Sequence, residues 1–313
     1  MKKSGKDFFN ELPAPAQRAL KQAGISTLQK LSQRTEAEVL KLHGMGPGSI
    51  PKLKTALKTK GLSFRSDNLK RALKKTKSTE EHTAKNFIAR LQKLQSDKEH
   101  EKIQRYFKSG EDDQFMGVQM GKVFALAKEF MDMSMDEIEK LLENPIHEVR
   151  TGAVSIMDFQ ARDKKTSAER KKELFELYIR RHDRINNWDL VDRAAPYVVG
   201  GYLFDKPRNM LYKLARSKNV WERRTAIVST YFFIRQNEVI DTFQIGELLV
   251  NDTHDLIHKA VGGWIREAGK RDRPRLIKFL DKHAATMPRT ALRYAIERLD
   301  KKEKERYLRG RNI

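Results

Sequence analysis

The chain contains 313 residues, carries a formal net charge of +22 and has no cysteine. The lack of cysteine excludes disulfides, thiolate zinc sites, iron–sulfur clusters and cysteine nucleophiles. A positive excess of this size predicts a polyanionic partner, either nucleic acid or an anionic membrane surface.

The first predicted elements form a small helical unit within residues 8–64. Gly24 is typical of a helix end, and Ser26 is placed to cap the helix that follows. Thr35 and Glu38 have the spacing of a capping box, in which each side chain bonds the backbone amide of the other residue. These signals predict three short helices ahead of a glycine-rich turn.

The turn "GMGPGSIPKLK" leads into a fourth predicted helix. Its glycines allow tight backbone geometry, and the first amides of the helix form an anion site that lysines would reinforce. The residues expected to contact DNA here are Gly44, Gly46, Gly48, Lys52 and Lys54. Residues 11–64 resemble a helix-hairpin-helix module of the kind found in the C-terminal domain of the RNA polymerase alpha subunit, which implies sequence-independent contact with DNA phosphates. The alternative is a glycine and proline turn in a small helical bundle.

Composition suggests the domain boundaries. Residues 1–65 are expected to form the helix-hairpin-helix DNA-binding domain, and residues 66–83 are polar and basic without a clear apolar stripe, which is typical of a linker. Residues 1–82 contain 18 Lys and Arg against 7 Asp and Glu, which is half of the excess charge. That concentration favours an electrostatic DNA tether.

Residues 84–313 read as a succession of amphipathic helices. Apolar residues recur three and four positions apart, the connections are short, and alternation with a period of two never extends beyond about five residues. Helix pairs of about 35 to 45 residues are typical of a HEAT-like solenoid with a concave surface. The predicted fold class is all-α, a HEAT-like helical-repeat solenoid with a small N-terminal helix-hairpin-helix domain.

The segment "NNWDLVD" places an indole near two carboxylates. On a helix, Trp188 and Asp192 would share one face because they are four positions apart. A structural interpretation is a helix start, in which Asn186 or Asn187 is the cap, Trp188 packs in the core and Asp189 complements the helix dipole. A functional interpretation is a catalytic acid in a basic groove.

Several segments, taken in order, resemble the AlkD family of DNA alkylation repair glycosylases over residues 84–305. They are "MGVQMGKVFALAK", "EVRTGAVSIMDFQAR", "NNWDLVD", "WERRTAIVST", "HKAVGGWIREAGKRD" and "MPRTALRYAIERL". The resemblance implies a solenoid whose concave face cradles duplex DNA. It also implies hydrolysis of the N-glycosidic bond of cationic N3- and N7-alkylpurines without a base pocket. On the matching positions, Asp192 is the catalytic carboxylate, Trp188 lies against the deoxyribose of the lesion, and Arg224 lies near the acid and the DNA backbone.

The physical chemistry suits these residue types. A cationic purine is already a good leaving group, so the charge that grows in the transition state is positive and lies on the sugar. Asp192 can stabilise that charge and orient water. The indole of Trp188 adds a cation–π contribution. Arg224 can hold a phosphate and keep Asp192 ionised.

One position departs from the family pattern. The family has another tryptophan in the motif that reads "HKAVGGWIRE" here, and an alignment without gaps puts Gly263 at that position and Trp264 one residue later. One residue is about 100° of helical rotation, so Trp264 either faces elsewhere or returns to the groove through a local bulge. Trp264 and Arg223 are counted among the residues expected to contact DNA.

Structural alternatives remain for the other charged residues. Asp192 could be a salt-bridge acid for Arg193 or Arg184, and Arg223 and Arg224 could form a solvated charge pair. The alternative function, which the glycine at position 263 keeps open, is a non-catalytic HEAT-repeat protein that binds damaged or structured DNA.

We expect no cofactor and no metal, because the eight histidines are scattered and none forms His-x-Asp or His-Glu-x-x-His. No apolar run approaches the roughly 18 residues of a membrane span, and the first residues lack the apolar core of a signal peptide. The expectation is a cytoplasmic, nucleoid-associated monomer whose partner is duplex DNA with alkylated purines and which does not bind a membrane.

Overall fold

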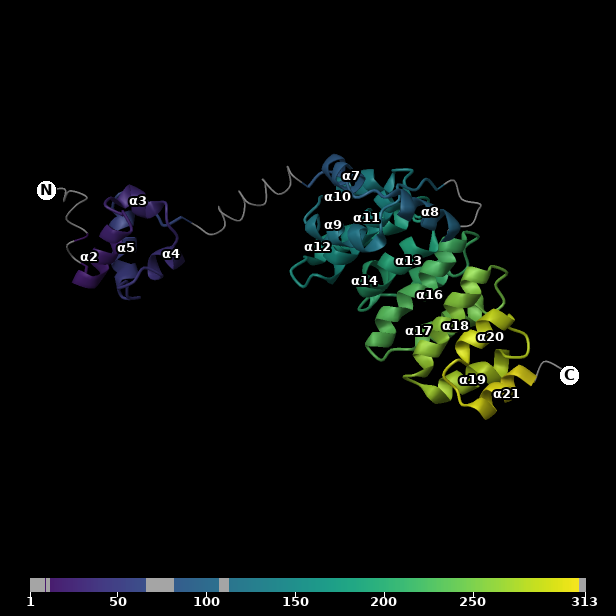
Figure 1. Ribbon diagram of the computed structural model, residues 1–313. Coiled ribbons are helices and arrows are strands. Elements are labelled where there is room, and N and C mark those ends of the chain that lie inside the picture. The colour runs from purple at the N-terminus through teal and green to yellow at the C-terminus, as the bar shows by residue number, and fades with distance from the viewer. Residues whose placement is uncertain (1–8, 10–11, 66–81, 107–112, 310–313) are drawn as a thin grey trace. The chain divides into compact units, whose positions relative to one another are not determined.

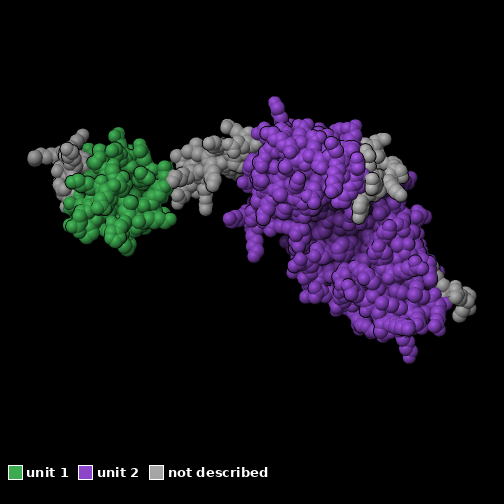
Figure 2. All heavy atoms as spheres, viewed as in Figure 1, with its two compact units in different colours: residues 1–80 green, residues 81–313 purple. Residues whose placement is uncertain are grey.

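The computed structural model describes residues 9, 12–65, 82–106 and 113–309. The chain divides into two compact units, residues 1–80 and 81–313, each with its own hydrophobic core (Figures 1 and 2). Within the described ranges the regular structure is helical, apart from one isolated β-bridge between Gln114 and Ile146, which confirms the predicted all-α class. None of the described helices is long and apolar enough to cross a membrane. Most of the predicted linker, residues 66–81, lies outside the described residues.

The first unit contains four short helices, α2 (Ala14–Gln22), α3 (Leu28–Ser32), α4 (Glu36–Leu40) and α5 (Ser49–Lys58). Gly24 follows α2 with a φ of +70°, which favours glycine. The capping box of Thr35 and Glu38 is confirmed. The predicted cap Ser26 is wrong, because Thr27 is the N-cap of α3 and its hydroxyl accepts the amide of the third helical residue. At both Thr27 and Thr35, the side-chain oxygen accepts a hydrogen bond from a backbone amide that has no partner within the helix.

The second unit is a stack of helices arranged in two rows (Figure 1). The first row contains α9 (Met120–Glu129), α11 (His147–Arg162), α13 (Trp188–Ala194), α16 (Val220–Arg235), α18 (Asp255–Gly269) and α20 (Arg289–Ala295). The second row contains α10 (Met135–Leu142), α12 (Ala168–Arg180), α15 (Asn209–Leu214), α17 (Ile240–Leu249) and α19 (Arg273–His283). The helices α7 (Ala84–Gln92) and α8 (Asp97–Tyr106) precede the rows, and α21 (Lys301–Arg309) follows them. Each first-row helix packs against the next, as in the predicted helical-repeat solenoid.

The first row contains a feature that the sequence analysis did not predict. After α13 the chain continues as a π-helix, η1 (Ala195–Gly200), and then as α14 (Gly201–Leu203). Pro196 has no N–H to donate to the carbonyl of Asp192, and the turn widens so that the amide of Gly201 bonds the carbonyl of Pro196. A Cβ on Gly200 would lie 2.1 Å from the carbonyl oxygen of Ser229 in α16. This glycine therefore allows η1 to pack directly on α16.

Candidate functional site

The N-terminus of α13 presents the indole of Trp188. Asn187 is the N-cap, and its side-chain oxygen accepts the backbone amide of Trp188 at 2.8 Å, so Asn187 rather than Asn186 is the cap. Trp188 is 40% exposed, whereas Trp221 is 8% exposed and belongs to the core. The structural interpretation of Trp188 as a core residue is therefore wrong.

Asp192 lies one helical turn beyond Trp188 and is bound by Arg224 of α16. The Nε and Nη2 atoms of Arg224 donate to the two carboxylate oxygens at 2.9 and 2.7 Å, in a two-point pair. The Nη1 atom of the same guanidinium donates to the carbonyl of Leu256 in α18 at 2.6 Å. Arg224 is 7% exposed, so it joins three first-row helices from a buried position.

The other arginines considered as partners of Asp192 bind elsewhere. Arg184 donates to the carbonyls of Leu142 and Glu143 at the end of α10. Arg193 donates to the hydroxyl of Ser155 in α11. Arg224 is thus the arginine that binds Asp192.

Asp192 lies in a densely packed environment, but part of its side chain is exposed to solvent. Burial raises the pKa of the Asp192 carboxyl above its ordinary value, Arg224 opposes that rise, and the nearby carboxylate of Asp189 adds to it. The side chain of Asp192 nevertheless keeps 37% of its surface exposed. The carboxylate of Asp192 is therefore bound by Arg224 and is still accessible to solvent.

A buried hydrogen-bond network fixes α16 behind the pair. The hydroxyl of Thr225, the residue after Arg224, bonds the hydroxyl of Tyr178 and the Nε2 atom of His182, both at 3.1 Å. Burial lowers the pKa of His182, which keeps the imidazole neutral near pH 7. The network fixes the rotation of α16 about its axis, and with it the direction of Arg224.

A second buried network anchors the start of α13. His147 is fully buried in α11, with its Nδ1 atom 3.2 Å from Asp113 and its Nε2 atom 2.7 Å from Asp189. Arg150 and the amide of Asn187 also bind Asp113. Burial lowers the pKa of His147, but the hydrogen bonds to the two carboxylates outweigh it and raise the pKa to about 9. Likewise, burial acts to raise the pKa of Asp113, and the hydrogen bonds of His147 and Arg150 lower it overall.

Sequence reasoning missed this anchor. The partners of His147 are 34 and 42 positions away, which leaves no local pattern. Asp189 was expected at the helix start, and it does lie in the first turn of α13.

The structure of α18, which contains Gly262 and Gly263, shows how Trp264 is oriented. The helix is continuous from Asp255 to Gly269, so no bulge redirects the chain. Trp264 packs against Tyr231 of α16, with ring centroids 5.2 Å apart. A Cβ on Gly262 would lie 2.3 Å from the carbonyl oxygen of Ala291 in α20, whereas a Cβ on Gly263 would meet no atom within 4 Å. Gly262 is therefore required by packing, and Gly263 borders open space.

Arg223 serves a different part of α16. Its Nε atom donates to Asp252 at 2.6 Å, and its Nη1 atom donates to the carbonyls of Ser217 and Lys218 at 3.0 and 2.9 Å. These bonds tie together the loops before α16 and α18, and none of them reaches Asp192.

The residues proposed for DNA contact in the first unit lie around the start of α5. Gly44 has a φ of +92°, and a Cβ there would lie 3.0 Å from the carbonyl oxygen of Pro15. Gly46 and Gly48 border open space, and Gly48 is the N-cap of α5. Lys52 and Lys54 lie on the exposed side of α5, where Lys54 pairs with Glu36 at 2.9 Å.

The arrangement at α13 has a definite chemical capacity. An exposed indole and an accessible carboxylate share one helix face, and a buried guanidinium orients the carboxylate. Such a carboxylate can stabilise a nearby cation or orient a water molecule. Within the described ranges, no group of three or more His, Asp or Glu could hold a metal ion.

Comparison with known proteins decides the family. The profile of the DNA alkylation repair enzyme family matches residues 87–299, more than half of the chain. The chain belongs to the DNA alkylation repair enzyme family. The matched range contains Trp188, Asp192 and Arg224, and membership supports a role in DNA repair.

A solved structure supports the fold of the DNA alkylation repair domain. This structure, a predicted DNA alkylation repair enzyme from Enterococcus faecalis, is 16% identical to the chain and superposes with a TM-score of 0.53. The likeness covers 66% of this chain and 98% of that one. At this identity it shows a shared solenoid fold.

Proposed function

We propose that the protein is an AlkD-like DNA glycosylase that hydrolyses the N-glycosidic bond of cationic N3- and N7-alkylpurines in duplex DNA, acting as a monomer in the cytoplasm. The observation that carries the proposal is the pairing of exposed Trp188 with accessible Asp192 on one face of α13. A buried acid or a core indole could not reach a DNA backbone.

The proposed mechanism uses each residue for one task. The alkylated base leaves without protonation because it is already cationic, and positive charge develops on the deoxyribose. Asp192 stabilises that charge and orients the attacking water. The exposed indole of Trp188 lies against the sugar and contributes cation–π stabilisation. Arg224 acts through Asp192, because its three bonding nitrogens contact the carboxylate and the carbonyl of Leu256.

Release of free base from a duplex containing N7-methylguanine tests the proposal. We expect release by the native protein and a loss of several orders of magnitude in Asp192→Asn, because an amide cannot stabilise a cationic sugar as a carboxylate does. Affinity for the duplex should be retained by the variant, and thermal unfolding checks that it folds.

Gly263 favours the second candidate, a DNA-binding protein without turnover, because the family's other tryptophan is missing at that position. Under this candidate the native protein binds alkylated duplex and releases no base. That result would replace the glycosylase proposal.

We also propose that the first unit is a helix-hairpin-helix tether for DNA phosphates. Its support is the glycine-rich N-terminus of α5 beside the exposed Lys52 and Lys54. Deleting residues 1–82 should flatten the dependence of DNA affinity on salt, because each phosphate contact contributes about 0.9 to the logarithmic slope. An unchanged slope would refute the tether.

A further inference from the structure

A group of cationic side chains lies further along the helical run that carries Asp192. Tyr197 of η1 lies five residues after Asp192, and the guanidinium carbon of Arg162 lies 3.8 Å from the centroid of its ring. Arg235 of α16 lies over the ring of Tyr231 at 5.9 Å. A hydrogen bond to Tyr231 and the proximity of Tyr197 raise the pKa of Arg235. We refer to these residues and their neighbours as the Tyr197 cluster, which consists of Asp158, Arg162, Lys171, Arg193, Tyr197 and Arg235.

The cluster contains more positive than negative charge. Arg162 and Arg193 share one carboxylate, that of Asp158, at 2.8 and 3.3 Å. Arg193 is also packed between aromatic rings, 4.7 Å from Phe124 and 4.8 Å from Phe159, so its role is internal. The groups that act on Arg235 are the phenols of Tyr231 and Tyr197 rather than a carboxylate, and Lys171 lines the same hollow as Arg162. The set therefore contains four cations and one buried carboxylate, that of Asp158, and such an excess of positive charge attracts an anion.

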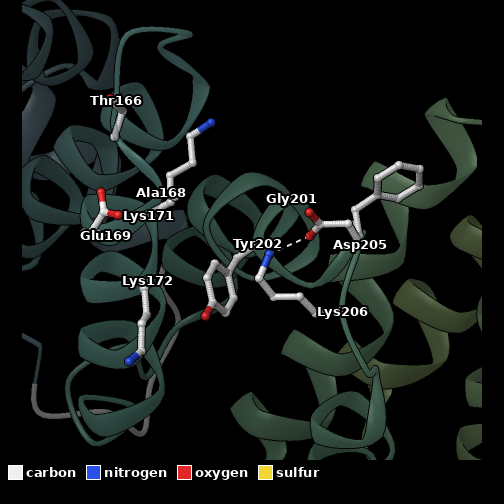
Figure 3. A pocket seen from close by; sticks show the side chains of 10 residues that line it. Thr166, Ala168, Glu169, Lys171, Lys172, Gly201, Tyr202, Asp205 and Lys206 are labelled. Atoms are coloured by element: carbon white, nitrogen blue, oxygen red, sulfur yellow. Dashed lines mark hydrogen bonds and ion pairs between the residues drawn. The ribbon is translucent and has the colours of Figure 1, made fainter.

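The cluster borders a cavity that an anion can enter. A hollow of about 190 Å³ is lined by Arg162, Lys171, Tyr197 and Tyr202, with apolar residues completing the wall. A larger hollow of about 540 Å³ adjoins it and shares Lys171 and Tyr202 as lining residues. Figure 3 shows the larger hollow with side chains of α12 on one side and Tyr202 and Lys206 on the other. There Glu169 and Asp205 offset part of the positive charge, so the smaller hollow is the more cationic of the two.

We propose that the Tyr197 cluster binds a phosphate group of the DNA backbone, at a site separate from the Asp192–Arg224 pair. Arg162, with 43% of its side chain exposed, and the exposed Arg235 supply fork-shaped donors that match phosphate oxygens. Arg224 and Arg235 are eleven residues apart on α16, which is about 16 Å along the axis. This separation exceeds the widths of both grooves of B-DNA, about 6 and 12 Å, so the cluster would contact a phosphate beyond the groove that the pair faces.

The inference rests on the DNA-binding part of the proposed function and is independent of base release. Arg162 and Arg235 are also the last residues of α11 and α16, where a cation complements the helix dipole. That structural role would change the unfolding temperature and leave the number of phosphate contacts unchanged. The salt dependence of DNA affinity separates the two roles.

The test compares Arg235→Gln, Arg162→Gln and the double variant with the native full chain. The affinity for a short undamaged duplex is measured over a range of salt concentrations, and thermal unfolding confirms the folded state. We expect the logarithmic slope to fall by about 0.9 for each phosphate contact removed. The matched control is Arg306→Gln on α21, an arginine that is 65% exposed and pairs with Asp281. The slope of the control should equal that of the native protein.

An unchanged slope in the folded double variant overturns the proposal. A titration with inorganic phosphate alone distinguishes a free anion from the DNA backbone. If phosphate stabilises the native protein and not the double variant while the slopes agree, the site takes a free anion, and the DNA assignment is wrong. If the native protein releases no base but the slopes differ as expected, the glycosylase proposal fails and the phosphate site stands.

Discussion

The carboxylate of Asp192 and the guanidinium of Arg224 form a two-point pair with contacts of 2.9 and 2.7 Å. Each carboxylate oxygen accepts one bond from Arg224 and keeps a further lone pair. Because 37% of the Asp192 side chain is exposed, these lone pairs can reach a ligand. The pair therefore resembles an oriented acid more than a closed structural salt bridge.

Substitutions of Trp188 test the proposed contact of its indole with the deoxyribose. Trp188→Ala should slow base release at saturating protein by about 2- to 30-fold, the equivalent of a cation–π contribution of roughly 0.5–2 kcal/mol. Trp188→Phe should lose less, because an aromatic face remains. Single-turnover release measures both effects. Equal rates for the native protein and Trp188→Ala would contradict the role of the indole.

Under the proposed mechanism, the acid limb of the pH–rate profile reports the ionisation of Asp192. Only the ionised carboxylate stabilises a cation, and burial raises its pKa above the ordinary 3.8, so the rate should fall as the pH drops through a value above 3.8. In Arg224→Gln the partner that lowers this pKa is lost, and the acid limb should move to higher pH. A profile with the same acid limb in both proteins would show that another group titrates.

The buried His147 should make stability depend on pH in the alkaline range. Its folded pKa of about 9 exceeds the ordinary 6.5, so its contribution is complete below pH 6.5 and is lost as the pH rises through 9. The shift corresponds to on the order of 3 kcal/mol. His147→Asn should unfold more easily at pH 6 and show a flatter stability curve between pH 6.5 and 9. Urea denaturation at several pH values measures this, and parallel curves would exclude a protonated imidazole.

The two neighbouring glycines of α18 form a matched pair for mutagenesis. Gly263→Ala should stabilise the protein by about 0.5–1 kcal/mol, because its Cβ meets open space and alanine is the better helix former. Gly262→Ala should destabilise it by about 1–3 kcal/mol, because its Cβ would overlap the carbonyl of Ala291. Denaturant midpoints give both values. Equal changes of the same sign would mean that α18 and α20 do not approach closely.

Local patterns predicted much of this structure. The capping box of Thr35 and Glu38 follows from hydrogen bonds between residues that are close in sequence, and so does a cap before Trp188, which the sequence placed at Asn186 or Asn187. The shared face of Trp188 and Asp192 follows from helical spacing alone. The predicted cap Ser26 was wrong, because the neighbouring Thr27 can also cap and the sequence does not fix where the first helical residue lies.

Local sequence patterns could not predict contacts between helices that are far apart in the sequence. The bonds of His147 with Asp113 and Asp189, the position of Trp264 against Tyr231 and the engagement of Arg223 with Asp252 depend on how helices pack. The π-helical turn had one local sign, the proline in the helical run after α13, but its width depends on the close contact with α16.

Arg224 has one more consequence, which concerns the shape of the solenoid. Its guanidinium bonds Asp192 in α13 and the carbonyl of Leu256 in α18, the two first-row neighbours of α16. The three bonds together constrain the angles between these helices. A bend of the solenoid at this point would break the bond to Asp192 or the bond to Leu256 and change the orientation of the carboxylate. Under the proposed function, the orientation of the acid therefore depends on the curvature of the solenoid.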